Sequence, residues 1–161
     1  MDIDSFALER WFAKHEHDAD LMLAESGIRP LDASRFDCQP DTLNYVIPTN
    51  GDPGLRSEIG DRYDLPGDQV LFTSGTQEAN FLIFASLMDR DSHAVVITPT
   101  YQALHAVPDA LGAVTRVNLQ PPQWELDVSA VVDAIRPNTE LIVINNPNNP
   151  TGRYHPERTV R

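Results

Sequence analysis

Hydrophobic and polar positions alternate in blocks along the chain after about residue 70. Short continuous apolar runs, which are typical of buried strands, are separated by longer stretches with helical spacing. These runs predict four strands, at residues 70–73, 94–98, 113–119 and 141–144. The succession of strand, helix and strand predicts βαβ units in a largely parallel sheet, with helices on both faces.

Three helices are predicted between these strands, at residues 76–88, 102–111 and 127–135. Pro108 is a candidate break in the second helix, because proline lacks the amide hydrogen that a helix uses. Residues 1–69 have a different pattern, with two short predicted helices (6–13 and 55–63) among segments rich in proline, glycine and aspartate. We expect this part to form an arm or a partial second lobe.

The charge of the chain is strongly negative. Asp and Glu number 24 against 12 Lys and Arg, for a formal net charge of −12; 16 of the acids are Asp, and Lys14 is the only lysine. Such a surface repels nucleic acids and anionic membranes, so neither is expected as a partner. Abundant Asp with almost no Lys predicts a halophilic protein, whose self-repulsion is screened by strong salt. The alternative is an ordinary acidic protein.

Cysteine and histidine offer little chemistry. Cys38 is the only cysteine, which excludes an internal disulfide and a cysteine zinc site and predicts a reduced thiol. His15 and His17 are expected to be solvated, so we expect no metal site. The N-terminus has acids where a signal peptide needs bases, and the longest apolar run, residues 81–88, is far below the ~20 residues of a membrane span. These features predict a cytoplasmic protein.

Three loops are expected at the carboxyl ends of strands, where open α/β sheets bind ligands. The first is Ser-Gly-Thr-Gln at residues 74–77, between a strand and a helix. Glycine and the unpaired amides of a helix N-terminus suit a phosphate group there. Ser74 and Gln77 also match a capping box, which needs no ligand. Taken alone, this loop favours the cap.

The other two loops carry an aromatic ring and two Asn-Pro steps. Tyr101 follows a strand end, where a tyrosine either stacks on a planar ring or packs in the core. In residues 145–152, each proline holds the preceding residue, Asn146 or Asn149, away from helical angles. An amide held in this way is able to donate to one specific oxygen, whereas the alternative is a rigid turn.

Asn-Pro-Asn-Asn-Pro-Thr-Gly at residues 146–152 resembles the signature loop of the class I/II aminotransferases, which are fold-type I pyridoxal-phosphate (PLP) enzymes. Other segments follow in the family's order: Gly51-Asp-Pro-Gly-Leu-Arg56 resembles its G-x-x-x-L-R segment, residues 70–79 its strand and phosphate loop, and residues 97–101 its P-x-Y segment. The resemblance covers about residues 40–155.

The resemblance implies an α/β fold that is the N-terminal part of the large domain of these enzymes. This part has a mostly parallel sheet with helices on both faces and is incomplete at its C-terminus. Residues 1–40 are then expected to form the N-terminal arm and a partial small lobe. Residues 41–161 are expected to form the N-terminal half of the PLP-binding large domain.

The resemblance also implies a cofactor site for PLP. Ser74, Gly75 and Thr76 would hold its 5′-phosphate, Tyr101 would stack on its pyridine ring, and Asn149 would hydrogen-bond its phenolic oxygen. Two further residues would act near them. Tyr45 matches a tyrosine that reaches the phosphate of a neighbouring subunit, and Gly27 would lie near the substrate carboxylate.

One essential group of the family is missing from the chain. The family needs a lysine that forms a Schiff base with PLP, but Lys14 lies in the wrong part of the order, and we expect it to be a solvated helix residue. No catalytic residue is therefore assigned. The missing parts lie after the Asn-Pro loop in the family, which predicts a truncated chain that is inactive alone.

The parent activity implied by the resemblance is the transfer of an amino group between an amino acid and a 2-oxo acid, by a homodimer. Two alternatives stay open. One is a PLP-dependent lyase or decarboxylase of the same fold. The other is a non-catalytic remnant or binding module, which the missing lysine favours.

Overall fold

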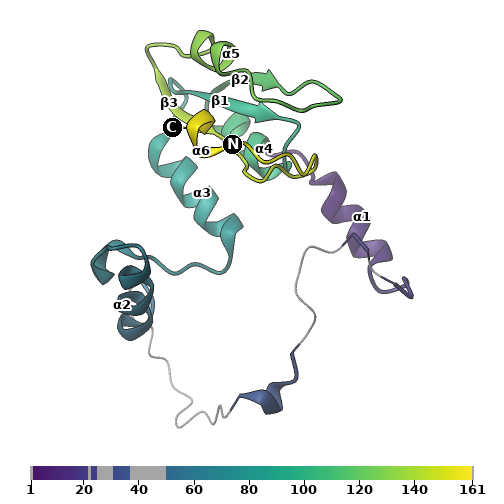
Figure 1. The fold of residues 1–161 in the computed structure, drawn as a ribbon, viewed down its shortest axis with the longest axis vertical. Coiled ribbons are helices and arrows are strands. Elements are labelled where there is room, and N and C mark those ends of the chain that lie inside the picture. The colour runs from purple at the N-terminus through teal and green to yellow at the C-terminus, as the bar shows by residue number, and fades with distance from the viewer. Residues whose placement is uncertain (1, 22, 25–30, 37–49, 161) are drawn as a thin grey trace. The chain divides into compact units, whose positions relative to one another are not determined.

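The computed structural model describes all residues except 1, 22, 25–30, 37–49 and 161 (Figure 1). The chain divides into two compact units, Met1–Phe6 with Ser74–Arg161, and Ala7–Thr73. The expected domain boundary after residue 40 lies outside the described residues.

A parallel sheet forms the centre of the first unit (Figure 1). It consists of β1 (His93–Thr98), β2 (Ala113–Asn118) and β3 (Thr139–Val143) in the order β2-β1-β3, and both pairings are parallel. The three strands predicted after residue 90 are thus confirmed. All six residues of β1 are buried, as expected for a central strand with both faces covered.

The helices of this unit are α3 (Thr76–Leu87), α4 (Ala103–Leu111), α5 (Val128–Asp133) and the short α6 (Glu157–Val160). The predicted break at Pro108 is wrong, because α4 continues through this residue. The pyrrolidine ring is fully buried, and the amide of Gly112 closes the helix on the Pro108 carbonyl at 3.0 Å. Burial of the ring offsets the one helix hydrogen bond that proline cannot donate.

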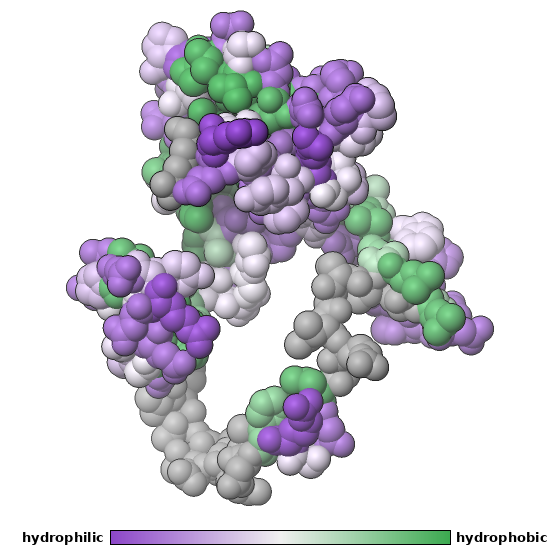
Figure 2. All heavy atoms as spheres, in the orientation of Figure 1, coloured by the Kyte–Doolittle hydropathy of each residue, from purple (hydrophilic) through white to green (hydrophobic). Residues whose placement is uncertain are grey.

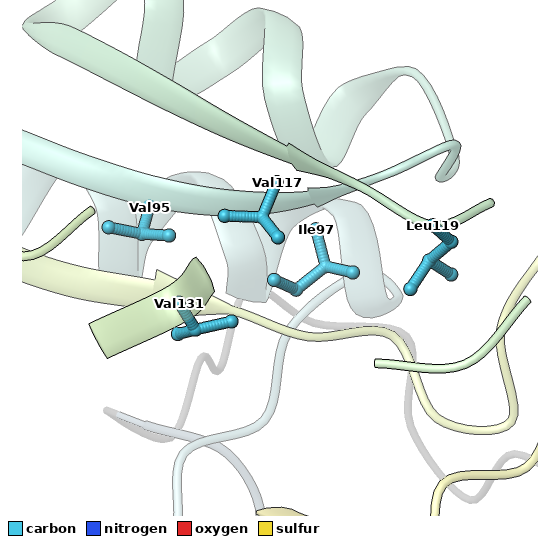
Figure 3. Packing of buried hydrophobic residues seen from close by; sticks show 5 residues of the cluster. All are labelled: Val95, Ile97, Val117, Leu119 and Val131. Atoms are coloured by element: carbon cyan, nitrogen blue, oxygen red, sulfur yellow. The ribbon is translucent and has the colours of Figure 1, made fainter. Parts of the chain in front are cut away.

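Alternate residues of β1 enter two separate cores. Val95 and Ile97 pack with Val117, Leu119 and Val131 of α5 (Figure 3). Ala94 and Val96 lie on the opposite face and pack with Met88, which follows α3, and with Leu111 of α4. The period-two alternation of the strand therefore places apolar residues on both faces, and the predicted two-sided α/β architecture is confirmed.

The second unit contains α1 (Ala7–His15), α2 (Pro53–Arg62) and two short 3₁₀ turns, Ala33–Arg35 and Gly67–Gln69. Both helices were predicted, within a few residues at each end. Asp52 caps α2, since its carboxylate accepts a hydrogen bond from the amide of Leu55 at 2.8 Å.

The strand predicted at residues 70–73 is wrong. This segment pairs with no strand in the part of the chain that the structure describes. Its backbone makes single contacts instead: the amide of Val70 donates to the Gly67 carbonyl (3.2 Å), the amide of Phe72 donates to the Asn50 carbonyl (3.1 Å), and Arg56 Nε donates to the Val70 carbonyl (2.7 Å). An apolar run becomes a strand only where a neighbouring strand takes up its backbone groups.

Part of the apolar surface remains exposed. Of the apolar stripe predicted over residues 127–135, only Val131 is buried, while Val128, Val132 and Ile135 are 47%, 59% and 47% exposed. Figure 2 shows hydrophobic surface at the top of the view, over α5. Several apolar side chains of α3 are also about half exposed, among them Ile83 and Leu87. Among the described residues, no helix has both the length and the apolar character that crossing a bilayer would require.

Candidate functional site

The loops that follow β1 and β3 meet at the carboxyl edge of the sheet. The contact between them is made by Asn148, which is 3% exposed. Its side-chain amide donates to the carbonyl oxygen of Pro99, after β1, at 3.1 Å and to Thr151 Oγ1, within its own loop, at 2.9 Å. Two segments that are about 50 residues apart in sequence are thereby joined.

The Asn-Pro loop, residues 145–152, is closed on itself by further hydrogen bonds. The amide of Gly152 donates to the Asn148 carbonyl (2.7 Å), and the amide of Asn148 donates to the Arg153 carbonyl (2.8 Å). The side chain of Asn146 takes both backbone groups of His155, accepting from its amide at 2.9 Å and donating to its carbonyl at 2.8 Å. Such a closed network holds a loop in one conformation.

Asn149 and Tyr101 lie on these two joined loops. Asn149 is exposed, and its side chain makes no hydrogen bond with the part of the chain that the structure describes; only its carbonyl accepts, from Asn145 Nδ2 at 3.4 Å. Tyr101 is half-buried just before α4, and its carbonyl accepts from the amide of Leu104 at 3.0 Å. The Asn149 amide is thus available to a ligand oxygen.

The N-terminus of α3 is open. The amide of Ala79 donates to the Gly75 carbonyl, which is the first backbone hydrogen bond of this helix. The amides of Thr76, Gln77 and Glu78 come before it and have no carbonyl partner within the helix. Gly75 has φ +96°, and a Cβ on this residue would meet nothing within 4 Å. Amide donors beside open space at a positive helix end are suited to a phosphate group. These residues therefore fit a phosphorylated cofactor.

The predicted capping box at this helix is wrong. Gly75 is the cap residue, and because glycine has no side chain it makes no side-chain capping bond. The side chain that contacts the backbone before the helix is that of Glu78, not that of Gln77. Its Oε2 accepts a hydrogen bond from the amide of Ser74 at 2.5 Å. The loop shifts the helix start by one residue because glycine adopts the positive φ that the turn requires.

Comparison with known proteins identifies the family. Residues 33–161, most of the chain, match the family described as "Aminotransferase class I and II". The chain belongs to this family. Enzymes of this family depend on pyridoxal phosphate.

Three relatives illustrate the match. A probable aspartate aminotransferase of Methanocaldococcus jannaschii is 28% identical, over 73% of this chain and 33% of its own length. A histidinol-phosphate aminotransferase of Listeria innocua is 32% identical, over 68% of this chain and 30% of its own. A crystal structure of a PLP-dependent aminotransferase from Streptococcus suis superimposes with a TM-score of 0.84 at 28% identity, over 99% of this chain and 47% of its own.

These figures also define what the chain covers. It spans about a third of the length of the curated aminotransferases and about half of the solved one. The fold is therefore part of the fold-type I aminotransferase fold, as the sequence predicted. The ordered segments of residues 51–56, 70–79, 97–101 and 146–152, rather than composition or charge, carried that prediction.

A cavity of about 640 Å³ opens beside this site, at the ends of β1 and β2. Its lining combines the Thr98-Pro99-Thr100 segment with Arg116 and Trp124. Two of its polar atoms, Thr100 Oγ1 and His105 Nδ1, are buried and have no hydrogen-bond partner among the described residues. Sequence reasoning missed this cavity, because its walls come from segments that only the sheet brings together.

His155 is another residue without a sequence signal. It is 2% exposed, and its Nε2 has no hydrogen-bond partner in the described part of the chain. Burial lowers the pKa of His155, and the positive charge of Arg153 lowers it further, so the ring is neutral at pH 7. Arg153 itself pairs with Glu125 at 2.9 Å.

The remaining predicted residues lie elsewhere. Tyr45, Gly27 and Cys38 are outside the described residues. Lys14 is exposed in the last turn of α1, in agreement with the expected solvated residue. No group of three or more potential metal ligands occurs within the described ranges.

Proposed function

We propose that this chain is the cofactor-binding part of a PLP-dependent aminotransferase that moves an amino group between an amino acid and a 2-oxo acid. The observation that carries the proposal is the hydrogen bond between Asn148 and the Pro99 carbonyl, 3.1 Å long. It joins the family's Asn-Pro loop to the loop that bears Tyr101. The family match over residues 33–161 supports the same activity.

The proposed cofactor site has two halves. Gly75 and Thr76 hold the 5′-phosphate through backbone amides at the N-terminus of α3, and Ser74 adds its hydroxyl group. Tyr101 stacks on the pyridine ring, and the side-chain amide of Asn149 donates to its phenolic oxygen. When bound, PLP supplies the electron sink for chemistry at the amino-acid Cα. The residues of this chain bind and orient it.

The remaining contacts belong to a larger assembly. We assign Tyr45 to the phosphate of a neighbouring subunit and Gly27 to the substrate carboxylate, in a homodimer. The division into residues 1–40 and 41–161, a cytoplasmic location and a halophilic character are part of the same proposal. The net charge of −12 supports the last of these.

A binding role without catalysis is the second candidate function, and it is favoured by the lysine content. Lys14 is the only lysine, and it lies exposed on α1. A PLP-dependent lyase or decarboxylase of the same fold is an alternative for the longer protein, since it would use the same loops. Neither alternative changes the residues that hold the cofactor.

The phosphate half is tested by substituting Gly75. Gly75→Val adds a β-branched side chain at φ +96°, where L-residues are strained, beside the proposed phosphate. We expect it to abolish binding of PLP and of inorganic phosphate, as measured by equilibrium dialysis. Gly54→Val, in the first turn of α2, is the control and should bind like the wild type. Unchanged affinity of the Gly75 variant would show that the phosphate binds elsewhere.

The two candidate functions are separated by trapping with borohydride. A chain without a Schiff-base lysine should bind PLP but give no adduct at a unique site after reduction, as mapped by peptide mass spectrometry. A single adduct on Lys14 would contradict our interpretation of this residue. Lys14→Arg, which keeps the charge, is the matched control for reactivity at that position.

A further inference from the structure

The residue that holds the two ring-binding loops together has no assigned role. The site above needs Tyr101 and Asn149 at fixed positions, which requires a residue that joins their two loops. Asn148 does so, through its bond to the Pro99 carbonyl at 3.1 Å. A side chain next to Asn149 in sequence thus contacts the backbone two residues before Tyr101.

We propose that Asn148 is a positioning residue for the ring half of the cofactor site: it fixes the Asn-Pro loop against the loop after β1 and so sets Asn149 relative to Tyr101. This inference rests on the proposed function for its consequence in PLP binding. The coupling between the loops rests on the contacts alone. Asn148 does not itself hold the ring.

The chemistry of the side chain explains why asparagine suits this position. A side-chain NH₂ group carries two donors, and both are used, one across to the Pro99 carbonyl and one within the loop to Thr151 Oγ1 at 2.9 Å. Asn148 is 3% exposed, so water does not replace these bonds easily. Its backbone amide and carbonyl are occupied too, by Arg153 and Gly152.

The other end of the contact leads into α4. Beyond Pro99, the carbonyls of Tyr101 and Gln102 accept from the amides of Leu104 (3.0 Å) and Ala106 (2.9 Å), which form the first turn of this helix. Loss of the Asn148 contact should therefore loosen the first turn of α4. The last turn, closed by the Gly112 amide on Pro108, should not respond.

The structure offers a matched control at the opposite edge of the sheet. Asn138 Nδ2 donates to the Asp91 carbonyl at 2.6 Å, and this contact joins the segments that precede β1 and β3. Asn138→Ala therefore removes the same kind of bond between neighbours of the same two strands. It is far from the candidate site and corrects for a general loss of stability.

The test measures amide hydrogen exchange in the full chain without any ligand. Asn148→Ala and the isosteric Asn148→Asp, which has no side-chain N–H to donate at neutral pH, should speed exchange at Leu104 and Ala106 about tenfold. Exchange at Gly112 should stay unchanged in both Asn148 variants, and Asn138→Ala should leave exchange at Leu104 and Ala106 as in the wild type. Wild-type exchange at Leu104 and Ala106 in Asn148→Asp, or equal acceleration at all three amides, would overturn the coupling.

A second readout separates the two halves of the site. Asn148→Ala should weaken PLP binding about tenfold while inorganic phosphate binds within about twofold of the wild type. Equal loss of both ligands, or of neither, would contradict a role in the ring half. If the wild type binds neither PLP nor phosphate, the proposed function fails for this chain, and with it the role in PLP binding. The exchange experiment would still decide whether Asn148 couples the loops.

Discussion

His93 joins all three strands of the sheet through its side chain. It is fully buried, and its ring nitrogens lie 2.7 Å from Thr139 Oγ1 on β3 and 2.8 Å from Thr115 Oγ1 on β2. Burial lowers the pKa of His93, and the charge of Arg136 lowers it further. The folded state therefore holds the neutral ring.

This burial predicts a loss of stability in acid. Below the ordinary histidine pKa of 6.5, the unfolded chain takes up a proton at His93 that the folded chain does not. The neutral, buried ring therefore costs no stability above pH 6.5, and the free energy of unfolding should fall as the pH drops below 6.5. Urea unfolding at several pH values between 5 and 8 measures how the free energy of unfolding changes with pH.

Two variants assign the slope to this residue. His93→Asn should be less stable at pH 8 but show a smaller loss of stability between pH 6.5 and 5. His17→Asn, at an exposed position, is the control for replacing a histidine outside the core. The remaining slope is assigned in part to His155, whose pKa is lowered for the same reason. An identical slope in wild type and His93→Asn would contradict the prediction.

At the scale of elements, the critical junction is the entry into β2. Gly112 ends α4 directly before β2, and an added Cβ would lie 2.6 Å from the carbonyl oxygens of both Asp89 and Ser92. These oxygens are backbone atoms of the turn before β1. The backbone itself would therefore have to move to make room for a Cβ. Glycine is required here by space, since its φ of −153° suits any residue.

Gly112→Ala should therefore destabilise the chain by about 1–3 kcal/mol, the range for forcing atoms into a packed site. Equilibrium urea unfolding followed by circular dichroism measures the change. Gly54→Ala is the control, because its Cβ would meet only Asp52 Oδ1, at 3.3 Å, in a helical position where alanine is favourable. Equal stability of the Gly112 variant and the wild type would show that the turn before β1 relaxes.

For the whole molecule, charge is the dominant surface property. The net charge of −12 is spread over 161 residues, and exposed acids such as Asp61, Asp64 and Asp68 have no ion-pair partner among the described residues. Their mutual repulsion opposes the compact state and is screened by salt. Apolar side chains such as Val132 on α5 and Leu87 on α3 are also exposed. Salt makes the exposure of apolar surface to water less favourable.

We expect the free energy of unfolding to rise as NaCl increases from about 0.05 M to about 1 M, where the Debye length falls to ~3 Å. The triple variant D61N/D64N/D68N removes three negative charges and should gain less from the same salt. Thermal melts at each salt concentration measure both slopes. Equal slopes in the two proteins would assign the effect to the apolar surface, and a falling stability would contradict the halophilic interpretation.

Sequence by itself determined the fold class and the family. The apolar run inside β1, residues 94–97, is a pattern that can be read from adjacent residues of the sequence. The Asn-Pro loop is likewise set by local restrictions on Asn146 and Asn149. These features depend on residues close together in the chain, and all of them could be predicted.

Tertiary structure decided the features that depend on distant partners. Residues 70–73 have the composition of a strand but pair with none in the described part of the chain, and Pro108 stays in α4 because the core buries its ring. The bond from Asn148 to Pro99 and the position of His93 between Thr115 and Thr139 join residues far apart in sequence. Only the folded sheet brings such groups within hydrogen-bond distance, because no local rule states which strands become neighbours.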